Sequence, residues 1–322
     1  MKRLAISLAL AAFTGIAAAP AQNYPARAGT IIVPFAAGGP ADITGRIVAD
    51  QLSKQLGQQF VVENIGGAGG TTGITRAARS APDGYTLALG HLGTHAASVA
   101  LFANLAYNPQ TDFEPIGLVA EQPELLVTRK ELPPNTLKEF VAYAKANESK
   151  LNMAHAGVGS VSYTGCLLLN AAIGIKPTLV PYTGTAPVMN ALLAGQVDYV
   201  CDPILGPLPH VRAGTLKALA ITSAKRHPAL PDIPTSAEGG LPQFNLTVFF
   251  GLFAPKGTPK PILDQLVAAL DKGLDDAAAR QRLVALGAAV AEKDRRGPAP
   301  LAALVKSEIA RLTPILKAAS AK

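Results

Sequence analysis

The sequence predicts an α/β protein whose mainly parallel sheets are flanked by helices, with enough chain for two compact lobes. Short β-branched or apolar runs alternate with segments of helical periodicity along most of the chain. Such βαβ alternation is typical of parallel strands covered by helices on both faces. About 300 residues follow a predicted leader peptide, which is more than one small domain needs.

The first 21 residues are typical of a secretory signal peptide. Lys2 and Arg3 precede an apolar stretch over 4–13, and small residues lead to Ala21. We predict cleavage between Ala21 and Gln22. The apolar stretch is shorter than the roughly 20 residues of a membrane-spanning helix, and no later segment reaches that length. We therefore expect export, without direct membrane insertion after cleavage.

The elements of the first unit follow from periodicity. A β-branched run over 30–35 predicts a strand, and a glycine-rich loop leads from it to a helix over 42–56. The apolar face of that helix comprises Ile43, Ile47, Val48, Leu52 and Leu56. The pattern then repeats as a strand over 59–63, a glycine loop over 66–73, a helix over 74–79 and a strand over 85–90.

A second α/β unit begins with a strand over 118–128 and a helix over 136–146, for which Thr136 is the expected N-cap. Its further strands are expected at 151–155, 177–180, 197–201 and 216–222, with helices at 161–172 and 186–193. Prolines between 228 and 242 then mark a turn-rich return to the first lobe. A last strand over 246–253 and helices over 259–270 and 300–316 complete the chain.

Charge indicates the class of partner. Removing Lys2 and Arg3 with the leader lowers the formal net charge from +7 to +5, and no Lys/Arg cluster is present. The sequence therefore predicts no nucleic-acid partner. A modest positive excess is compatible with an anionic ligand, which it attracts at long range.

Four loops carry the candidate chemistry, because each leaves the carboxyl end of a predicted strand and feeds a helix: 34–42, 66–73, 156–162 and 182–185. Ligands of open α/β sheets bind at that edge. Glycines there permit close backbone approach, and the N–H groups at a helix start favour an anion. Thr71, Ser160 and Thr185 add neutral hydroxyl donors. Any single loop of this kind can simply turn and cap the chain, but four together favour a binding site for a carboxylate.

Other candidate side chains have two interpretations each. Asp42 is expected to cap a helix, or to meet an amine or hydroxyl of the ligand. Phe35 is a core residue, or it shapes the distal end of the site. His91 and His95 have the spacing of a metal pair, but Gly90 and Gly93 interrupt the helix that such a pair requires. We therefore expect no metal, and the two histidines are expected to line the pocket or to be loop residues with satisfied hydrogen bonds.

The two cysteines, Cys166 and Cys201, leave two alternatives open. An oxidising compartment would permit a disulfide, and two separate buried thiols are the other possibility. The sequence contains no CxxC or Cys/His spacing for zinc, no GxxxxGK[ST] loop and no GxSxG elbow. We expect no cofactor and no catalysis.

Eight stretches, in order from Val33 to Pro259, carry a family resemblance: VPFAAGGPADITGRIVADQLSKQLGQ, VVENIGGAGGTTG, APDGYTL, LNMAHAGVGS, VPYTGTAPVMNALLAGQVD, AGTLKALAITSAKR, LPDIPTSAEGGLPQF and GLFAPKGTP. With them the sequence resembles the receptors of tripartite tricarboxylate transporters, often called the Bug family. The resemblance covers essentially the whole chain after the leader.

The resemblance implies a periplasmic Venus-flytrap receptor of the type II periplasmic-binding-protein fold that delivers a small carboxylate to membrane transporter subunits. Lobe 1 is expected to comprise 22–125 plus 225–322, and lobe 2 comprises 126–224. The ligand-binding residues expected from the four loops and from the family are Phe35, Ala37, Gly38, Gly39, Asp42, Thr71, Thr72, Thr94, His95, Gly157, Val158, Gly159, Ser160, Thr183, Gly184, Thr185 and Asp202.

Departures from the family pattern affect the ligand more than the fold. The family commonly has His at Tyr163, Lys at Thr183 and Trp at Phe249. Fewer cations near the cleft favour a mono- or dicarboxylate over a tricarboxylate. Two alternatives stay open: a receptor that reports its ligand to a signalling membrane partner, and a periplasmic enzyme of carboxylate metabolism.

Overall fold

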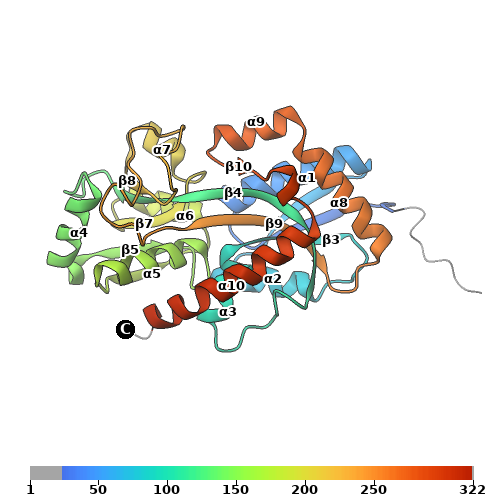
Figure 1. The fold of residues 1–322 in the computed structure, drawn as a ribbon, viewed down its shortest axis with the longest axis horizontal. Coiled ribbons are helices and arrows are strands. Elements are labelled where there is room, and N and C mark those ends of the chain that lie inside the picture. The colour runs from blue at the N-terminus through green and yellow to red at the C-terminus, as the bar shows by residue number, and fades with distance from the viewer. Residues whose placement is uncertain (1–23, 321–322) are drawn as a thin grey trace, which may run out of the picture.

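The computed structural model describes residues 24–320 (Figure 1). Its strands are β1 (Gly29–Val33), β2 (Phe60–Asn64), β3 (Thr86–His91), β4 (Phe113–Arg129), β5 (Asn152–His155), β6 (Thr178–Pro181), β7 (Tyr199–Pro203), β8 (Leu216–Ile221), β9 (Thr247–Pro255) and β10 (Ala289–Val290). Its α-helices are α1 (Pro40–Leu56), α2 (Thr71–Ala78), α3 (Ser98–Leu101), α4 (Leu137–Ala146), α5 (Val161–Ile173), α6 (Thr185–Leu193), α7 (Leu208–Arg212), α8 (Lys260–Leu274), α9 (Ala277–Ala285) and α10 (Pro298–Ser320). Short turns of other helix types are η2 (Ala68–Gly70), η3 (Gly93–Ala97), η4 (Glu148–Lys150) and η5 (Lys293–Arg295).

The strands form one mixed sheet in the order β2-β1-β3-β9-β4-β7-β5-β6, and β8 and β10 also pair with β4. The pairs at both ends of this order are parallel, as the βαβ alternation predicts. The middle is antiparallel, because β4 and β9 lie side by side in opposite directions. The chain leaves the first group of strands along β4 and returns to it along β9, which explains this arrangement.

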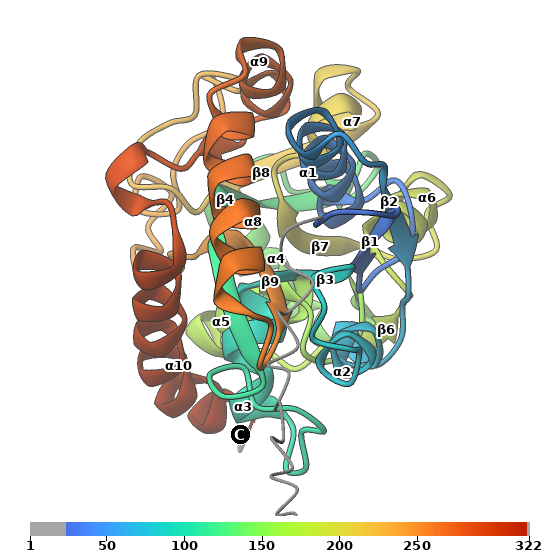
Figure 2. The same cartoon turned by 90° about the vertical axis from the view of Figure 1, so that its right-hand side faces the viewer.

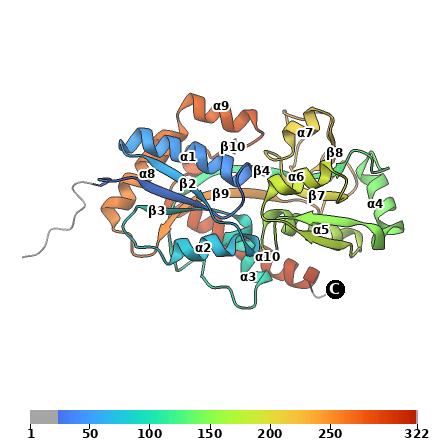
Figure 3. The ribbon, with the colours of Figure 1, turned by 180° about the vertical axis from the view of Figure 1, so that it is seen from behind.

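Strand β4 belongs to both parts of the molecule. Its residues 113–123 pair with β9, and its residues 124–128 pair with β7. We call the part built on β1, β2, β3, β9 and β10 lobe 1, and the part built on β5 to β8 lobe 2. In Figures 1 and 3 helices α4 to α7 surround lobe 2 at one end, and α1, α2 and α8 surround lobe 1 at the other. The residue boundaries predicted at 125 and 224 stay a prediction.

The sheet of lobe 2 is covered on both faces. Leu126 and Cys201 pack with α5 on one face, whereas Leu125 and Val200 pack with Val188 of α6 on the other. Successive residues of a strand point to opposite faces, so a strand buried on both sides is apolar at every position. This part of β4 is therefore apolar at successive positions because helices cover both faces of the sheet.

The C-terminal helix α10 packs against α3, β4 and α5, and so contacts elements of both lobes. In the side view of Figure 2 it runs along the flank of the molecule opposite to α2. Leu312 and Leu316 are buried in the lobe 1 core, against which Leu167 and Leu168 of α5 also pack. Among the described residues, no helix combines the length and apolar character that a membrane crossing requires.

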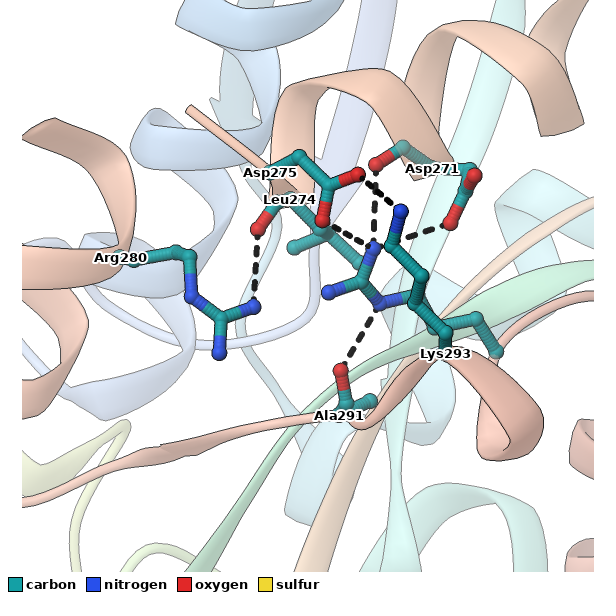
Figure 4. A network of polar contacts seen from close by, with 7 residues as sticks. Asp271, Leu274, Asp275, Arg280, Ala291 and Lys293 are labelled. Atoms are coloured by element: carbon teal, nitrogen blue, oxygen red, sulfur yellow. Dashed lines mark hydrogen bonds and ion pairs between the residues drawn. The ribbon is translucent and has the colours of Figure 1, made fainter. Parts of the chain in front are cut away.

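A buried arginine fastens the start of α10 (Figure 4). The Arg296 guanidinium donates to Asp271 Oδ1 at 3.0 Å, to Asp275 Oδ1 at 2.9 Å and to the Ala291 carbonyl at 2.8 Å. Lys293 adds an ion pair to Asp275 at 2.9 Å. This cluster joins the last turn of α8 to the segment that leads into α10.

Candidate functional site

A cavity lies where the two lobes meet. With the lobes closed in this way its volume is about 20 Å³, room for roughly one water molecule, so a ligand needs the lobes to part before it can enter. Both lobes contribute to its wall, which consists of Phe35, Gly39, Pro40, Ala41, His91, Ala156, Ser160, Val161, Ser162, Thr185, Asp202, Pro203 and Phe250.

Three helix N-termini converge on this cavity. Helices α1, α5 and α6 begin at Pro40, Val161 and Thr185, and all three residues line it. Each helix follows a strand whose carboxyl end faces the other lobe: β1 in lobe 1, and β5 and β6 in lobe 2, which run in the opposite direction to β1. The first N–H groups of a helix have no partner within the helix, and the helix dipole adds positive potential there. The site is therefore built for an anion.

The wall carries no lysine or arginine, so backbone dipoles and neutral groups supply the positive potential. Within residues 24–320 no group of His, Cys, Asp and Glu side chains is arranged to hold a metal ion. A carboxylate in this cavity would meet hydrogen-bond donors rather than a full counter-charge.

The glycine loops of the two lobes touch one another. A Cβ atom on Gly69 would overlap the carbonyl oxygen of Val158, and one on Gly93 would lie 2.5 Å from the carbonyl oxygen of Gly159. The Ala36 N–H donates to the Thr183 carbonyl at 3.2 Å, again from lobe 1 to lobe 2. These glycines permit backbone-to-backbone contact, and the arrangement is that of lobes closed on one another.

Ser160 and Ser162 shape the start of α5. Ser160 Oγ accepts from the Tyr163 N–H at 3.1 Å and is the N-cap, and it lies 3.2 Å from Ser162 Oγ. Ser162 Oγ accepts from the Ala156 N–H at 3.0 Å. Both side chains are buried and both line the cavity. Ser160 therefore has a structural role beside the ligand role that the sequence predicts.

Asp42 holds its own loop together. It accepts from the Gly38 N–H at 2.9 Å, from Arg46 at 3.0 Å and from Asn64 at 2.9 Å. Burial alone would raise the pKa of this carboxyl, but these hydrogen bonds outweigh it and lower the pKa. The carboxylate thus orders the loop that carries Gly39. It is not among the residues that line the cavity.

Asp202 is the acid at the cavity wall. Its Oδ1 accepts from Thr185 Oγ1 at 3.1 Å, and its buried Oδ2 has no partner among the described residues. Burial raises the pKa of Asp202 to about 8, and the Thr185 hydrogen bond lowers it only in part. Burial also raises the pKa of Glu124 well above its usual value, and the nearby Asp202 raises it further. With a pKa of about 8, Asp202 is mainly protonated at pH 7 and has a proton to donate.

His91 is a functional candidate that the sequence did not identify as a ligand residue. It ends β3, lines the cavity, stacks on Phe35 at 5.0 Å between ring centroids and meets Phe250 edge-on. Burial lowers the pKa of His91 to about 4, so the ring is neutral. The Thr94 N–H donates to His91 Nδ1 at 3.2 Å, which leaves the proton on Nε2. The ring therefore offers one neutral donor.

Of the residues predicted for the site, the cavity wall contains Phe35, Gly39, Ser160, Thr185 and Asp202. Loop residues that adjoin the wall without lining it are Ala37, Gly38, Gly157, Val158, Gly159, Thr183 and Gly184. Thr71 donates to the Ala68 carbonyl at 2.9 Å, and Thr72 packs near Gly67, both away from the cavity wall. The ligand contacts of all these residues stay a prediction.

Thr94 and His95 are placed differently from the expectation. Thr94 Oγ1 lies 3.0 Å from His95 Nδ1, and His95 stacks on Phe253 at 4.0 Å between ring centroids. Tyr107 and Phe113 complete this core cluster. Gly93 also begins the η3 turn rather than interrupting a helix, so His91 and His95 lie on different elements. His95 is thus a core residue.

The fold and this site define a two-lobe solute-binding protein. The sequence profile described as tripartite tricarboxylate transporter family receptor matches residues 44–320. A protein named for the TAR-I ttuE-ttuC' intergenic region of Agrobacterium vitis is 43% identical over 92% of this chain and 86% of its own length. The chain belongs to this receptor family, whose members are periplasmic solute-binding proteins that serve transport.

Two solved structures extend the similarity to ligands. MatC from Rhodopseudomonas palustris, described with bound malate, is 49% identical with a TM-score of 0.89, covering 91% of this chain and all of that one (100%). An R. palustris protein described with adipate is 32% identical with a TM-score of 0.87, covering 92% of this chain and 99% of that one. Malate and adipate are both small dicarboxylates.

Proposed function

We propose that this chain is a periplasmic receptor that captures a small dicarboxylate between its lobes and delivers it to the membrane subunits of a tripartite tricarboxylate-type transporter. The observation that carries the proposal is the convergence of three helix N-termini on a cavity without lysine or arginine. Such a site stabilises a carboxylate through N–H groups and dipoles.

The second carboxylate of the ligand is expected to meet the neutral donors of the wall. His91 Nε2–H and the protonated Asp202 lie in the same cavity as the helix N-termini. Each can donate to an oxygen without introducing a positive charge. Malate in MatC, at 49% identity, supports a ligand of this size and charge. A tricarboxylate would bring a third negative charge to a wall that carries no lysine or arginine.

The test is a calorimetric and thermal-shift panel of succinate, malate, fumarate, adipate, citrate and benzoate on the protein purified from the periplasm. An external dye reports unfolding, because the chain has no Trp. A dicarboxylate at about 100 times its Kd should add about 2.7 kcal/mol to the free energy of unfolding. No response to any carboxylate from ligand-free, folded protein would overturn the assignment.

Two variants of His91 sharpen the panel. His91→Phe fills the same space without a donor, whereas His91→Gln keeps an N–H donor. We expect His91→Phe to weaken dicarboxylate binding about tenfold, the equivalent of about 1.4 kcal/mol, and His91→Gln to weaken it less. If the two variants bind the dicarboxylate with equal affinity, the hydrogen-bond donor at this position does not contribute, and His91 only lines the cavity.

Delivery to the transporter needs a separate test. Uptake of the labelled ligand is compared between cells with and without this chain, and we expect uptake to fall when the chain is absent.

A further inference from the structure

The only two cysteines of the sequence meet beneath the ligand site. Cys166 lies on the second turn of α5 and Cys201 on β7, and both side chains are fully buried. The structure shows them as thiols whose Sγ atoms are 2.8 Å apart, and the Cys201 N–H donates to Cys166 Sγ at 2.8 Å. Two thiols are thus held face to face across a helix–strand contact.

The surroundings of the two cysteines do not support a role in ligand contact, metal binding or nucleophilic catalysis. Neither sulfur lines the ligand cavity, and no third ligand for a metal accompanies them among the described residues. Burial raises the pKa of both thiols, so neither is a thiolate nucleophile. The pair packs in the apolar core between α5 and the sheet, beside Leu126 and Tyr199.

We propose that Cys166 and Cys201 are joined by a disulfide in the exported protein. The inference rests on the proposed function in one respect: that function places the chain in the periplasm, an oxidising compartment that forms and preserves such bonds. One thiolate attacks the disulfide of a thiol–disulfide oxidoreductase and forms a mixed disulfide, which the second thiolate then resolves. The chain loses two protons and two electrons, and the oxidoreductase is reduced to its dithiol. This exchange takes place during folding, before the sulfurs are buried.

The bond would fix the lobe 2 side of the ligand site. Residue 202, the acid at the cavity wall, directly follows Cys201, and α5 presents Ser160 and Ser162 at the turn before Cys166. The covalent link would hold these two parts of the wall at a constant separation. It also closes a loop between residues 35 positions apart, which restricts the unfolded chain.

The test is to quench the periplasmic protein in acid, unfold it and label free thiols with N-ethylmaleimide, with and without a reductant. We expect no label without the reductant and two labels after it, together with a cross-linked peptide that contains both cysteines. Two labels without the reductant, in protein recovered from the periplasmic fraction, would overturn the proposal. Dicarboxylate binding measured on the same sample tests the proposed function separately.

A stability measurement distinguishes a formed bond from a mere pair of thiols. Reducing the unfolded chain before refolding should lower the midpoint of thermal unfolding by about 5–10 °C. The matched control is the double variant Cys166→Ala/Cys201→Ala, whose midpoint should not respond to the reductant. An equal response of the double variant, or none in the native chain, would contradict the disulfide.

Discussion

At the scale of single residues, we expect Asp202 to make ligand binding depend on pH. Its pKa of about 8 lies above the ordinary value of 3.8, because the folded protein buries the carboxyl and favours its neutral form. The folded state therefore holds this proton more tightly than the unfolded chain. The associated stability is complete below about pH 4 and is lost as the pH rises from there through about 8.

We expect the affinity for a dicarboxylate to fall about tenfold between pH 7 and pH 9. Ionised Asp202 no longer donates a hydrogen bond and repels the anion, and the ligand's own charge does not change in this range. The measurement is calorimetry at both pH values. His91, with a pKa of about 4, stays neutral throughout.

The matched variants for this prediction are Asp202→Asn and Glu124→Gln. Asp202→Asn keeps a neutral donor and should remove the pH dependence, whereas Glu124→Gln should retain it, because Glu124 does not line the cavity. An unchanged fall in affinity for Asp202→Asn would assign the titration to another group.

The sequence indicated those site residues whose role depends on local geometry. Ser160 follows a glycine turn and precedes a helix, so its position at a helix start was readable from its neighbours. For His91 the sequence left a position in the pocket wall open but did not indicate a donor, because its tautomer depends on Thr94 and its ring meets Phe250 from a distant strand. His95 was expected in the cleft, but the rings that enclose it arrive with β4 and β9.

At the scale of elements, periodicity located the long helices and most strands, and Thr136 is confirmed as the N-cap of α4, where it accepts from the Glu139 N–H at 3.2 Å. The elements that were not predicted are α3, α7, α9 and β10. Three of them are short and give little periodic signal, whereas α9 has nine residues but buries only Ala279 and Leu283. Tertiary contacts place them, as when Ala289 and Val290 pair with β4.

Arg296 shows how such contacts fasten an element (Figure 4). The side chain of Arg296 is only 4% exposed, whereas those of Asp271 and Asp275 are 50% and 40% exposed. Solvent screens the two acids, so most of the stabilisation is expected from hydrogen bonds to the buried guanidinium, including the one to the Ala291 carbonyl.

We expect Arg296→Met to lower the free energy of unfolding by about 2–3 kcal/mol, because the Ala291 carbonyl loses its donor and the junction of α8 with α10 loosens. Chemical denaturation of the ligand-free protein measures the change. Arg296→Lys is the matched control. It keeps the charge but lacks the planar fork, so it should recover only part of the loss. Full recovery by lysine would mean that charge alone holds the junction.

At the scale of the whole molecule, the lobes are closed through contacts between their loops. Gly184 of lobe 2 reaches Ala36 of lobe 1, and a Cβ on Gly184 would lie 3.0 Å from Ala36 N and 3.1 Å from Ala36 Cβ. The φ of Gly184 is 170°, which is extended backbone open to any residue. A side chain there would disturb closure without straining lobe 2 itself.

We therefore expect Gly184→Val to weaken dicarboxylate binding by tenfold or more while leaving the ligand-free unfolding midpoint within about 2 °C of the native chain. A ligand held by both lobes shifts the population to the closed form only if that form is accessible. Small-angle scattering measures the closure directly. The native chain should become more compact when ligand is added, and Gly184→Val should change less at equal occupancy. A variant that closes and binds like the native chain would show that ligand capture does not need this loop contact.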